Sequence, residues 1–348
     1  MPDLVPDRAE VEKLLLINAA LEGGLVDVLA AESGAPAERV VSAGAAAEEV
    51  ARRAGTDLRA TRILLDALVD IGVAEAKPAG PSAASEGEIL YVLSPEARRR
   101  LVDPGPDYVR NSLLHQVSKM RGWLDLPHVL REGRPRPTER SEDRLRSFVR
   151  TMAEGDPEAM DEVVERTLAY LTRGRTVEET DGRRIRVLDA GGAVGHMALR
   201  FHGRGLDAVL CDRPEVLSEA RDYLGPSADH IDLLACDFTE NLPDGQFDLV
   251  YLGNVYHIYG PETNAELTRR VFGRLKPDGV IAIRDFVRGR SPRAAMFAVN
   301  MLQATEAGGV WSEAEFRAWL ESAGFSEIEI LDLERSDNQL ILGRKRLG

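Results

Sequence analysis

The sequence contains few cysteines and no long apolar run. Only two of its 348 residues are cysteine, which excludes a small fold held together by several disulfide bridges. Cys211 and Cys236 end neighbouring predicted strands, and we interpret them more readily as small buried side chains than as reactive thiols. No apolar run approaches the ~20 residues of a membrane helix, and the first residues lack a secretion-signal pattern. We therefore expect a cytoplasmic protein that has no membrane partner.

Positive charge is also scarce, with 44 Lys and Arg residues against 58 Asp and Glu residues and a formal net charge of -14. Such a surplus of negative charge repels nucleic acid and anionic lipid surfaces, so we expect neither as a partner. The rest of the composition, 44% apolar and 29% charged, is that of an ordinary globular protein. The length is sufficient for two domains, each with a core of its own.

Hydrophobic periodicity divides the chain into three parts. Residues 1–105 show helical spacing followed by two short extended runs, an order of elements that predicts a winged helix. Residues 106–175 indicate helices that link two domains. Residues 176–348 alternate strand-like and helix-like segments, which favours an α/β domain with a parallel sheet. The last two of its seven predicted strands are close in sequence, and we expect them to pair as an antiparallel edge. The predicted strands are Arg186–Leu188, Ala208–Cys211, Asp232–Ala235, Asp248–Leu252, Val280–Arg284, Ile328–Leu331 and Gln339–Leu342.

A glycine-rich loop, within residues 187–195, joins the first of these strands to a helix. Glycines let a ligand approach the backbone closely, and the following helix directs its free N–H groups toward that ligand. A dinucleotide loop requires glycine at its first, third and sixth positions, but counting from Gly191 the last two are Ala193 and His196. The pattern favours instead a loop in which Asp189 ends the strand and faces the amino group of a methionine moiety. A simple strand-to-helix turn stays as the alternative.

Two further carboxylates follow the second and third strands. Asp212 is placed to accept both hydroxyls of a ribose, and Asp237, with Phe238 beside it, to contact an adenine ring. Taken singly, each could be a solvated loop residue. Because ligands bind beyond the carboxyl ends of parallel strands, three carboxylates at three consecutive strand ends favour a site for an adenosyl group.

His257 follows the fourth strand and lies at the same predicted sheet edge as the glycine loop. A histidine there is suited to take a proton near neutral pH, and Asp285, at the end of the fifth strand, could orient it. A histidine held for structural reasons at the start of a loop is the alternative. No spacing of His, Cys, Asp or Glu suggests a metal site.

These motifs together resemble the class I S-adenosylmethionine-dependent small-molecule O-methyltransferases that carry an N-terminal winged-helix dimerisation domain, the family of the plant caffeate and acetylserotonin enzymes and their bacterial branch. The resemblance spans nearly the whole chain, and as a set the motifs are specific. They are, in family order, the glycine loop Asp189–Gly195, Asp212–Val216, Cys236–Phe238, the His257 segment, Leu275–Gly279, Gly308–Gly309, Phe316 and Ala323–Phe325.

The resemblance implies a Rossmann-like domain with a seven-stranded, mostly parallel sheet and a homodimer formed through the N-terminal domain. It implies S-adenosyl-L-methionine as cofactor, S-adenosyl-L-homocysteine as product and a small hydroxylated acceptor, aromatic or polyketide-like. His257 would be the general base and Asp285 its acidic partner. The implied cofactor-binding residues are Asp189, Gly191, Gly192, Gly195, Asp212, Arg213, Asp237, Phe238 and Asn254. The implied acceptor-binding residues are His115, Phe148, Met152, Asn300 and Met301.

Three positions depart from the family pattern. Ile258 and Tyr259 follow His257, where the family has an acidic residue and a tryptophan, and Val310–Ser312 stands where a second acidic partner is usual. The central glycine of the loop is Ala193. These departures keep open transfer to carbon or nitrogen, or non-methylating chemistry on the same scaffold.

A ligand-sensing DNA-binding regulator also joins a winged helix to a nucleotide-binding domain. Residues 1–105, however, contain 11 Lys and Arg residues against 18 Asp and Glu residues. Contact with phosphates requires an excess of positive charge, so the sequence argues against DNA binding.

Overall fold

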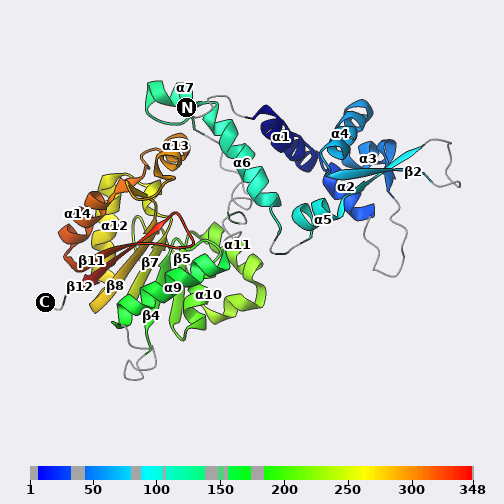
Figure 1. Ribbon diagram of the computed structural model, residues 1–348. Coiled ribbons are helices and arrows are strands. Elements are labelled where there is room, and N and C mark those ends of the chain that lie inside the picture. The colour runs from blue at the N-terminus through cyan, green and yellow to red at the C-terminus, as the bar shows by residue number, and fades with distance from the viewer. Residues whose placement is uncertain are drawn as a thin grey trace. The chain divides into compact units, whose positions relative to one another are not determined.

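The chain folds into two compact units, residues 1–120 and 121–348, and each is described by itself (Figure 1). The boundary falls inside the segment 106–175 that we expected to link two domains. The structure is a computed structural model, and it describes residues 7–32, 44–79, 88–103, 105, 107–137, 149, 151, 156–173 and 184–346.

The first unit contains two helices, α3 (Ala47–Ala54) and α4 (Leu58–Asp70), followed by a hairpin of two strands, which is the order of elements expected for a winged helix. Asp57 begins the second of these helices, because its side chain accepts a hydrogen bond from the Ala60 N–H, and Ser94 caps the helix after the hairpin in the same way. Among the described residues no single helix is long and apolar enough to cross a membrane, and α1 and α2 meet that test only jointly, across a 64° bend. The elements are α1 (Arg8–Glu22), α2 (Leu25–Glu32), β1 (Ala45–Ala46), α3 (Ala47–Ala54), α4 (Leu58–Asp70), β2 (Ala74–Pro78), β3 (Ile89–Leu93), α5 (Pro95–Leu101) and α6 (Arg110–Trp123), which runs into the second unit.

The second unit is built on a seven-stranded sheet in the order β11-β12-β8-β7-β4-β5-β6. All seven predicted strands are present, and the strands from β4 to β8 pair in parallel. The last two strands do pair antiparallel as expected, but β12 lies between β8 and β11, so that of these two strands only β11 is at an edge of the sheet. The strands are β4 (Arg186–Ala190), β5 (Asp207–Asp212), β6 (Asp232–Ala235), β7 (Phe247–Gly253), β8 (Leu275–Asp285), β11 (Phe325–Asp332) and β12 (Gln339–Lys345).

Helices cover both faces of this sheet, giving three layers (Figure 1). One core joins α9, α10 and α11 to the face that carries Val187 and Tyr251, and another joins α12 and α14 to the face that carries Leu188 and Leu252. Because both faces of the central strands are buried, these strands appear in the sequence as continuous apolar runs. The helices are α7 (Leu126–Glu132), α9 (Pro157–Thr172), α10 (His196–Gly203), α11 (Pro214–Leu224), α12 (Pro261–Arg274), α13 (Ala294–Ala304) and α14 (Glu313–Ala323), with β9 (Val287–Arg288) and β10 (Trp311–Ser312) as a small separate sheet.

The strand order reverses between β4 and β7. From β4 the chain continues outward to β5 and β6, and then returns to the other side of β4 to form β7 and β8. Connections from adjacent strands therefore diverge at this point, and ligands of open α/β sheets bind beyond the strand ends at such a point. The glycine loop follows β4 and the His257 segment follows β7, so both predicted halves of the site border this switch point.

Candidate active site

The glycine loop between β4 and α10 depends on the absence of side chains. Gly191 has a φ of 74°, and a Cβ there would lie 3.0 Å from the Phe238 ring. A Cβ on Gly192 would overlap the Asp189 carboxylate. Ala193 adopts a φ of 49°, the left-handed conformation that glycine tolerates best, which explains why a glycine is usual at this position. The glycines thus allow the loop to pack tightly against Asp189 and Phe238.

Asp189 lies beneath this loop and is fully buried. Its Oδ2 accepts a hydrogen bond of 3.0 Å from the backbone N–H of Ala198, in the first turn of α10. The carboxyl group therefore holds the loop against the helix that follows. Contact with the amino group of a methionine moiety, which we expected, stays a prediction, and the burial of Asp189 favours a supporting role.

Burial raises the pKa of Asp189 to about 7, the Ala198 N–H opposes this rise, and the neighbouring Asp212 carboxylate adds to it. The folded state therefore binds this proton more tightly than the unfolded chain does. The resulting stability is complete below about pH 4 and is lost as the pH rises through about 7. We expect wild-type stability, relative to that of Asp189→Asn, to fall between about pH 4 and pH 7, as measured by urea unfolding. Parallel stability curves for the two proteins would contradict the protonated, buried carboxyl.

The Asp212 carboxylate, at the end of β5, is directed back toward the loop. Its Oδ2 accepts from the Ala193 N–H at 3.0 Å and its Oδ1 from the Arg213 N–H at 2.8 Å. Burial raises its pKa, while these two backbone bonds lower it. Asp212 thus joins the glycine loop to the start of α11, and each oxygen retains a second lone pair for a ribose hydroxyl.

Three other predicted cofactor residues lie around the same loop. Phe238 is buried, and its ring packs against Gly191 and edge-on to Tyr259. Asp237 is exposed and its Oδ1 accepts hydrogen bonds from the backbone and the hydroxyl of Thr239. Asn254, with a φ of 59°, directly follows β7 beside the switch point. The structure therefore gathers the predicted adenosyl-binding residues along the ends of β4, β5, β6 and β7.

His257 and Asp285 meet at the carboxyl ends of β7 and β8. His257 Nδ1 lies 2.8 Å from Asp285 Oδ1, and the backbone N–H of His257 donates to Asp285 Oδ2 at 3.1 Å. Because the carboxylate is an acceptor, Nδ1 carries the proton and Nε2 keeps its lone pair. The ring is 8% exposed, and the edge of Phe297 approaches it with ring centroids 4.8 Å apart. This is the arrangement of a base whose orientation is fixed by a second group.

The backbone around His257 is held by three residues that were not predicted as site residues, Gly309, Trp311 and Asn264. The Gly309 N–H donates to the His257 carbonyl at 2.9 Å, and Trp311 Nε1 donates to the Tyr256 carbonyl at 2.9 Å. The side chain of Asn264 donates to the carbonyls of Tyr256 and Tyr259. Of these residues, only Gly309 belongs to a motif that was recognised in the sequence, the Gly308–Gly309 pair. Trp311 thus stands where the family has a second acid, and it restrains the segment through the backbone.

The predicted acceptor-binding residues are only partly placed. Asn300 and Met301 are on α13, one turn beyond Phe297, and Asn300 Oδ1 accepts from Trp123 Nε1 at 2.7 Å. His115 belongs to α6 in the first unit, where burial, followed by the nearby Lys119, lowers its pKa. Phe148 and Met152 lie outside the described residues.

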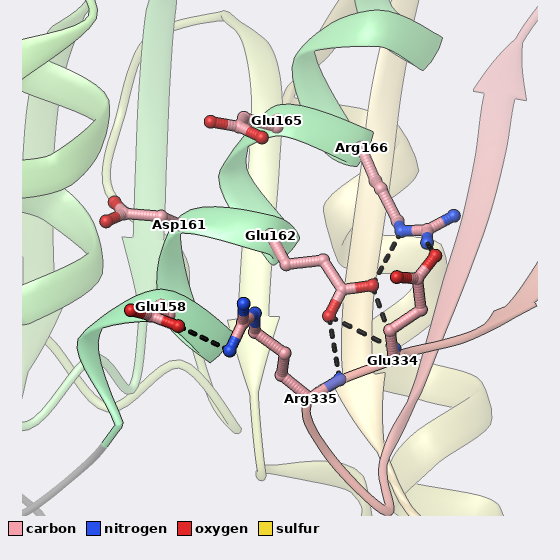
Figure 2. A pocket seen from close by; sticks show the side chains of 7 residues that line it. All are labelled: Glu158, Asp161, Glu162, Glu165, Arg166, Glu334 and Arg335. Carbon is pink, nitrogen blue, oxygen red and sulfur yellow. Dashed lines mark hydrogen bonds and ion pairs between the residues drawn. The ribbon is translucent and has the colours of Figure 1, made fainter.

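A surface pocket elsewhere on this unit has a structural explanation (Figure 2). It lies between α9 and the connection from β11 to β12, and only charged side chains line it. Glu162 accepts hydrogen bonds from Arg166 and from the backbone N–H groups of Glu334 and Arg335, which ties the connection to the helix. None of the predicted site residues lines this pocket. Within the described parts of the chain, no three His, Cys, Asp or Glu side chains are arranged to hold a metal ion.

Comparison with known proteins agrees with this geometry. The O-methyltransferase domain family matches residues 123–326. The tetracenomycin polyketide synthesis 8-O-methyl transferase of Streptomyces glaucescens is 28% identical over 314 residues, which are 85% of this chain and 86% of that protein. The acetylserotonin O-methyltransferase of Mus musculus is 30% identical over 313 residues, which are 82% of this chain and 76% of that protein.

Solved structures share the fold. Human N-acetylserotonin methyltransferase in complex with SAM matches with a TM-score of 0.72 and 21% identity, over 99% of this chain and 100% of that one. The mitomycin 7-O-methyltransferase structure matches with a TM-score of 0.70 and 23% identity, over 97% and 95%. The glycine loop, which leads into the N-terminus of α10, and the Asp212 carboxylate beside it suit the same cofactor here. The chain therefore belongs to the O-methyltransferase family and is an S-adenosylmethionine-dependent methyltransferase.

Proposed function

We propose that this enzyme transfers the methyl group to a hydroxyl of a small aromatic or polyketide-like metabolite, with His257 as the general base. The observation that carries the proposal is the buried His257–Asp285 pair at the switch point, in a chain of this family. Several relatives are named for O-methylation of small molecules, among them 3-amino-4-hydroxybenzoate 4-O-methyltransferase of Streptomyces cremeus, 29% identical over 332 residues.

The residues of the chain divide the work between holding the cofactor and moving a proton. When bound, S-adenosylmethionine supplies an activated methyl group on a sulfonium sulfur. The loop backbone at Gly191 and Gly192 would bind its methionine end, and Asp212 would bind the ribose hydroxyls. His257 Nε2 takes the proton of the acceptor hydroxyl as the oxygen attacks, and Asp285 stabilises the resulting imidazolium.

The acceptor would contact α13, where Asn300 and Met301 lie one turn beyond Phe297. This helix is mostly apolar, yet Ala294 is its only residue classed as buried, which leaves surface for a hydrophobic ligand. We further propose that the protein is a homodimer formed through the first unit. In α1 only three of fifteen residues are buried, and Leu15 is 45% exposed, so an apolar surface is available for a partner.

The direct test is product analysis with three acceptors that share one ring system, a naphthol or hydroxyanthraquinone and its amino and methyl analogues. We expect the hydroxyl compound alone to gain one methyl group, on oxygen, because an aromatic hydroxyl is acidic enough for His257 to deprotonate during attack, whereas an aromatic amine is a far weaker acid and the methyl analogue has no such group. Mass spectrometry and NMR would locate the new group. Methylation of carbon, or of the amine in preference to the hydroxyl, would overturn the proposed reaction.

A further inference from the structure

The two cysteines of the chain meet beside the proposed adenosyl site. Cys211 is the penultimate residue of β5 and Cys236 directly follows β6, with α-carbons 5.8 Å apart, and the structure joins their side chains in a disulfide. We expected two small buried side chains; Cys211 is buried as expected, but the pairing of the two cysteines was not predicted. No other cysteine exists in the 348 residues, so neither cysteine has an alternative partner within the chain.

The disulfide is integrated with the backbone that carries the cofactor residues. The Cys211 carbonyl accepts a hydrogen bond of 2.8 Å from the Gly191 N–H, at the start of the glycine loop. The Cys236 N–H donates to the Asp212 carbonyl at 2.9 Å. Each cysteine also directly precedes a predicted cofactor-binding residue: Cys211 precedes Asp212, and Cys236 precedes Asp237. A change at the disulfide therefore reaches both the ribose side and the adenine side of the site.

The strand β6 is the shortest strand of the seven-stranded sheet. It comprises four residues, Asp232–Ala235, at the edge of the sheet, and it pairs only with β5. Three of the four residues are exposed. Breaking the covalent link would leave this short strand, and the Asp237–Phe238 turn that follows it, free to separate from β5. Phe238 would then lose its fixed position against Gly191.

We propose that Cys211 and Cys236 form a reversible thiol–disulfide pair that sets the affinity of the adenosyl site, with the disulfide form binding more tightly. Cys236 is half-buried and Cys211 fully buried, so a small reagent reaches Cys236 first. With a low-molecular-weight disulfide such as glutathione disulfide, the Cys236 thiolate attacks one sulfur and displaces one glutathione thiolate. The Cys211 thiolate then attacks the Cys236 sulfur and displaces the second. Two protein thiols are oxidised, two glutathione thiols form, and the two thiol protons balance them.

The experiment compares full-length protein treated with excess glutathione disulfide and protein treated with dithiothreitol. Alkylation under denaturing conditions followed by intact mass counts the free thiols, and calorimetry measures the affinity for S-adenosylhomocysteine. We expect the oxidised form to have no free thiol and to bind at least about fivefold more tightly than the reduced form. The matched control is Cys236→Ser, which should bind like the reduced wild type and should not respond to glutathione disulfide.

Because the proposal rests on the adenosyl site described above, the two must be able to fail separately. Equal affinity of the oxidised and reduced forms, or persistence of two free thiols in excess glutathione disulfide, would overturn the switch and leave the cofactor site intact. Absence of S-adenosylhomocysteine binding in both forms and in Cys236→Ser would overturn the adenosyl site and the switch together.

Discussion

The variant His257→Ala is expected to turn over at least about 1,000-fold more slowly than the wild type while binding S-adenosylhomocysteine within about twofold of it. The reason is that the His257 ring contacts Asp285 and Phe297, whereas most of the residues predicted to bind the cofactor are in the glycine loop and at the ends of β5 and β6. Steady-state kinetics with an accepted hydroxyl compound and calorimetry with the product measure the two quantities.

Two variants control this comparison. His202→Ala removes an exposed imidazole at the end of α10, far along the chain from the proposed base, and should keep wild-type turnover. Asp285→Asn retains the shape of the carboxylate but loses its charge, so turnover should lie between that of the wild type and that of His257→Ala. A loss of cofactor affinity as large as the loss of turnover would assign His257 a structural role instead.

The variant Gly192→Ala is expected to weaken S-adenosylhomocysteine binding by at least about tenfold. A single added methyl group would overlap the carboxylate of Asp189, which is fully buried beneath the loop and cannot move into solvent. The loop must therefore shift, and with it the backbone that the cofactor approaches. Calorimetry against the product measures the effect.

Gly203→Ala is the matched control, because a Cβ at that position, the last residue of α10, meets no atom within 4 Å. We expect wild-type affinity for this variant. Equal affinities of Gly192→Ala and Gly203→Ala would show that the tight packing of the loop over Asp189 is not needed for binding.

The central strands of the sheet were predicted well, because they are buried on both faces and therefore appear as short, continuous apolar runs. Arg186–Leu188 and Asp248–Leu252, for example, are each extended by only two residues in β4 and β7. The position of β12 between β8 and β11 could not be predicted from the sequence. Proximity in sequence indicates that β11 and β12 pair, but it does not indicate which of the two also pairs with β8.

The candidate site was predictable where residues follow strand ends, since parallel strands bring their carboxyl ends to one edge. That rule places His257 and Asp285 together although 28 positions separate them. It does not extend to contacts made through backbone carbonyls, such as that of Trp311 with Tyr256, or to contacts between helices, such as that of Trp123 with Asn300. The sequence places Cys211 and Cys236 at the ends of neighbouring strands but does not show that their side chains meet, so the disulfide was not predicted.

The role of His257 is tested most directly by the single-turnover rate of methyl transfer with both substrates saturating, which separates the chemical step from product release. We predict that His257→Ala reacts at least about 1,000-fold more slowly than the wild type, and that added imidazole restores part of its rate by replacing the missing base. A single-turnover rate equal to that of the wild type would contradict proton removal by His257.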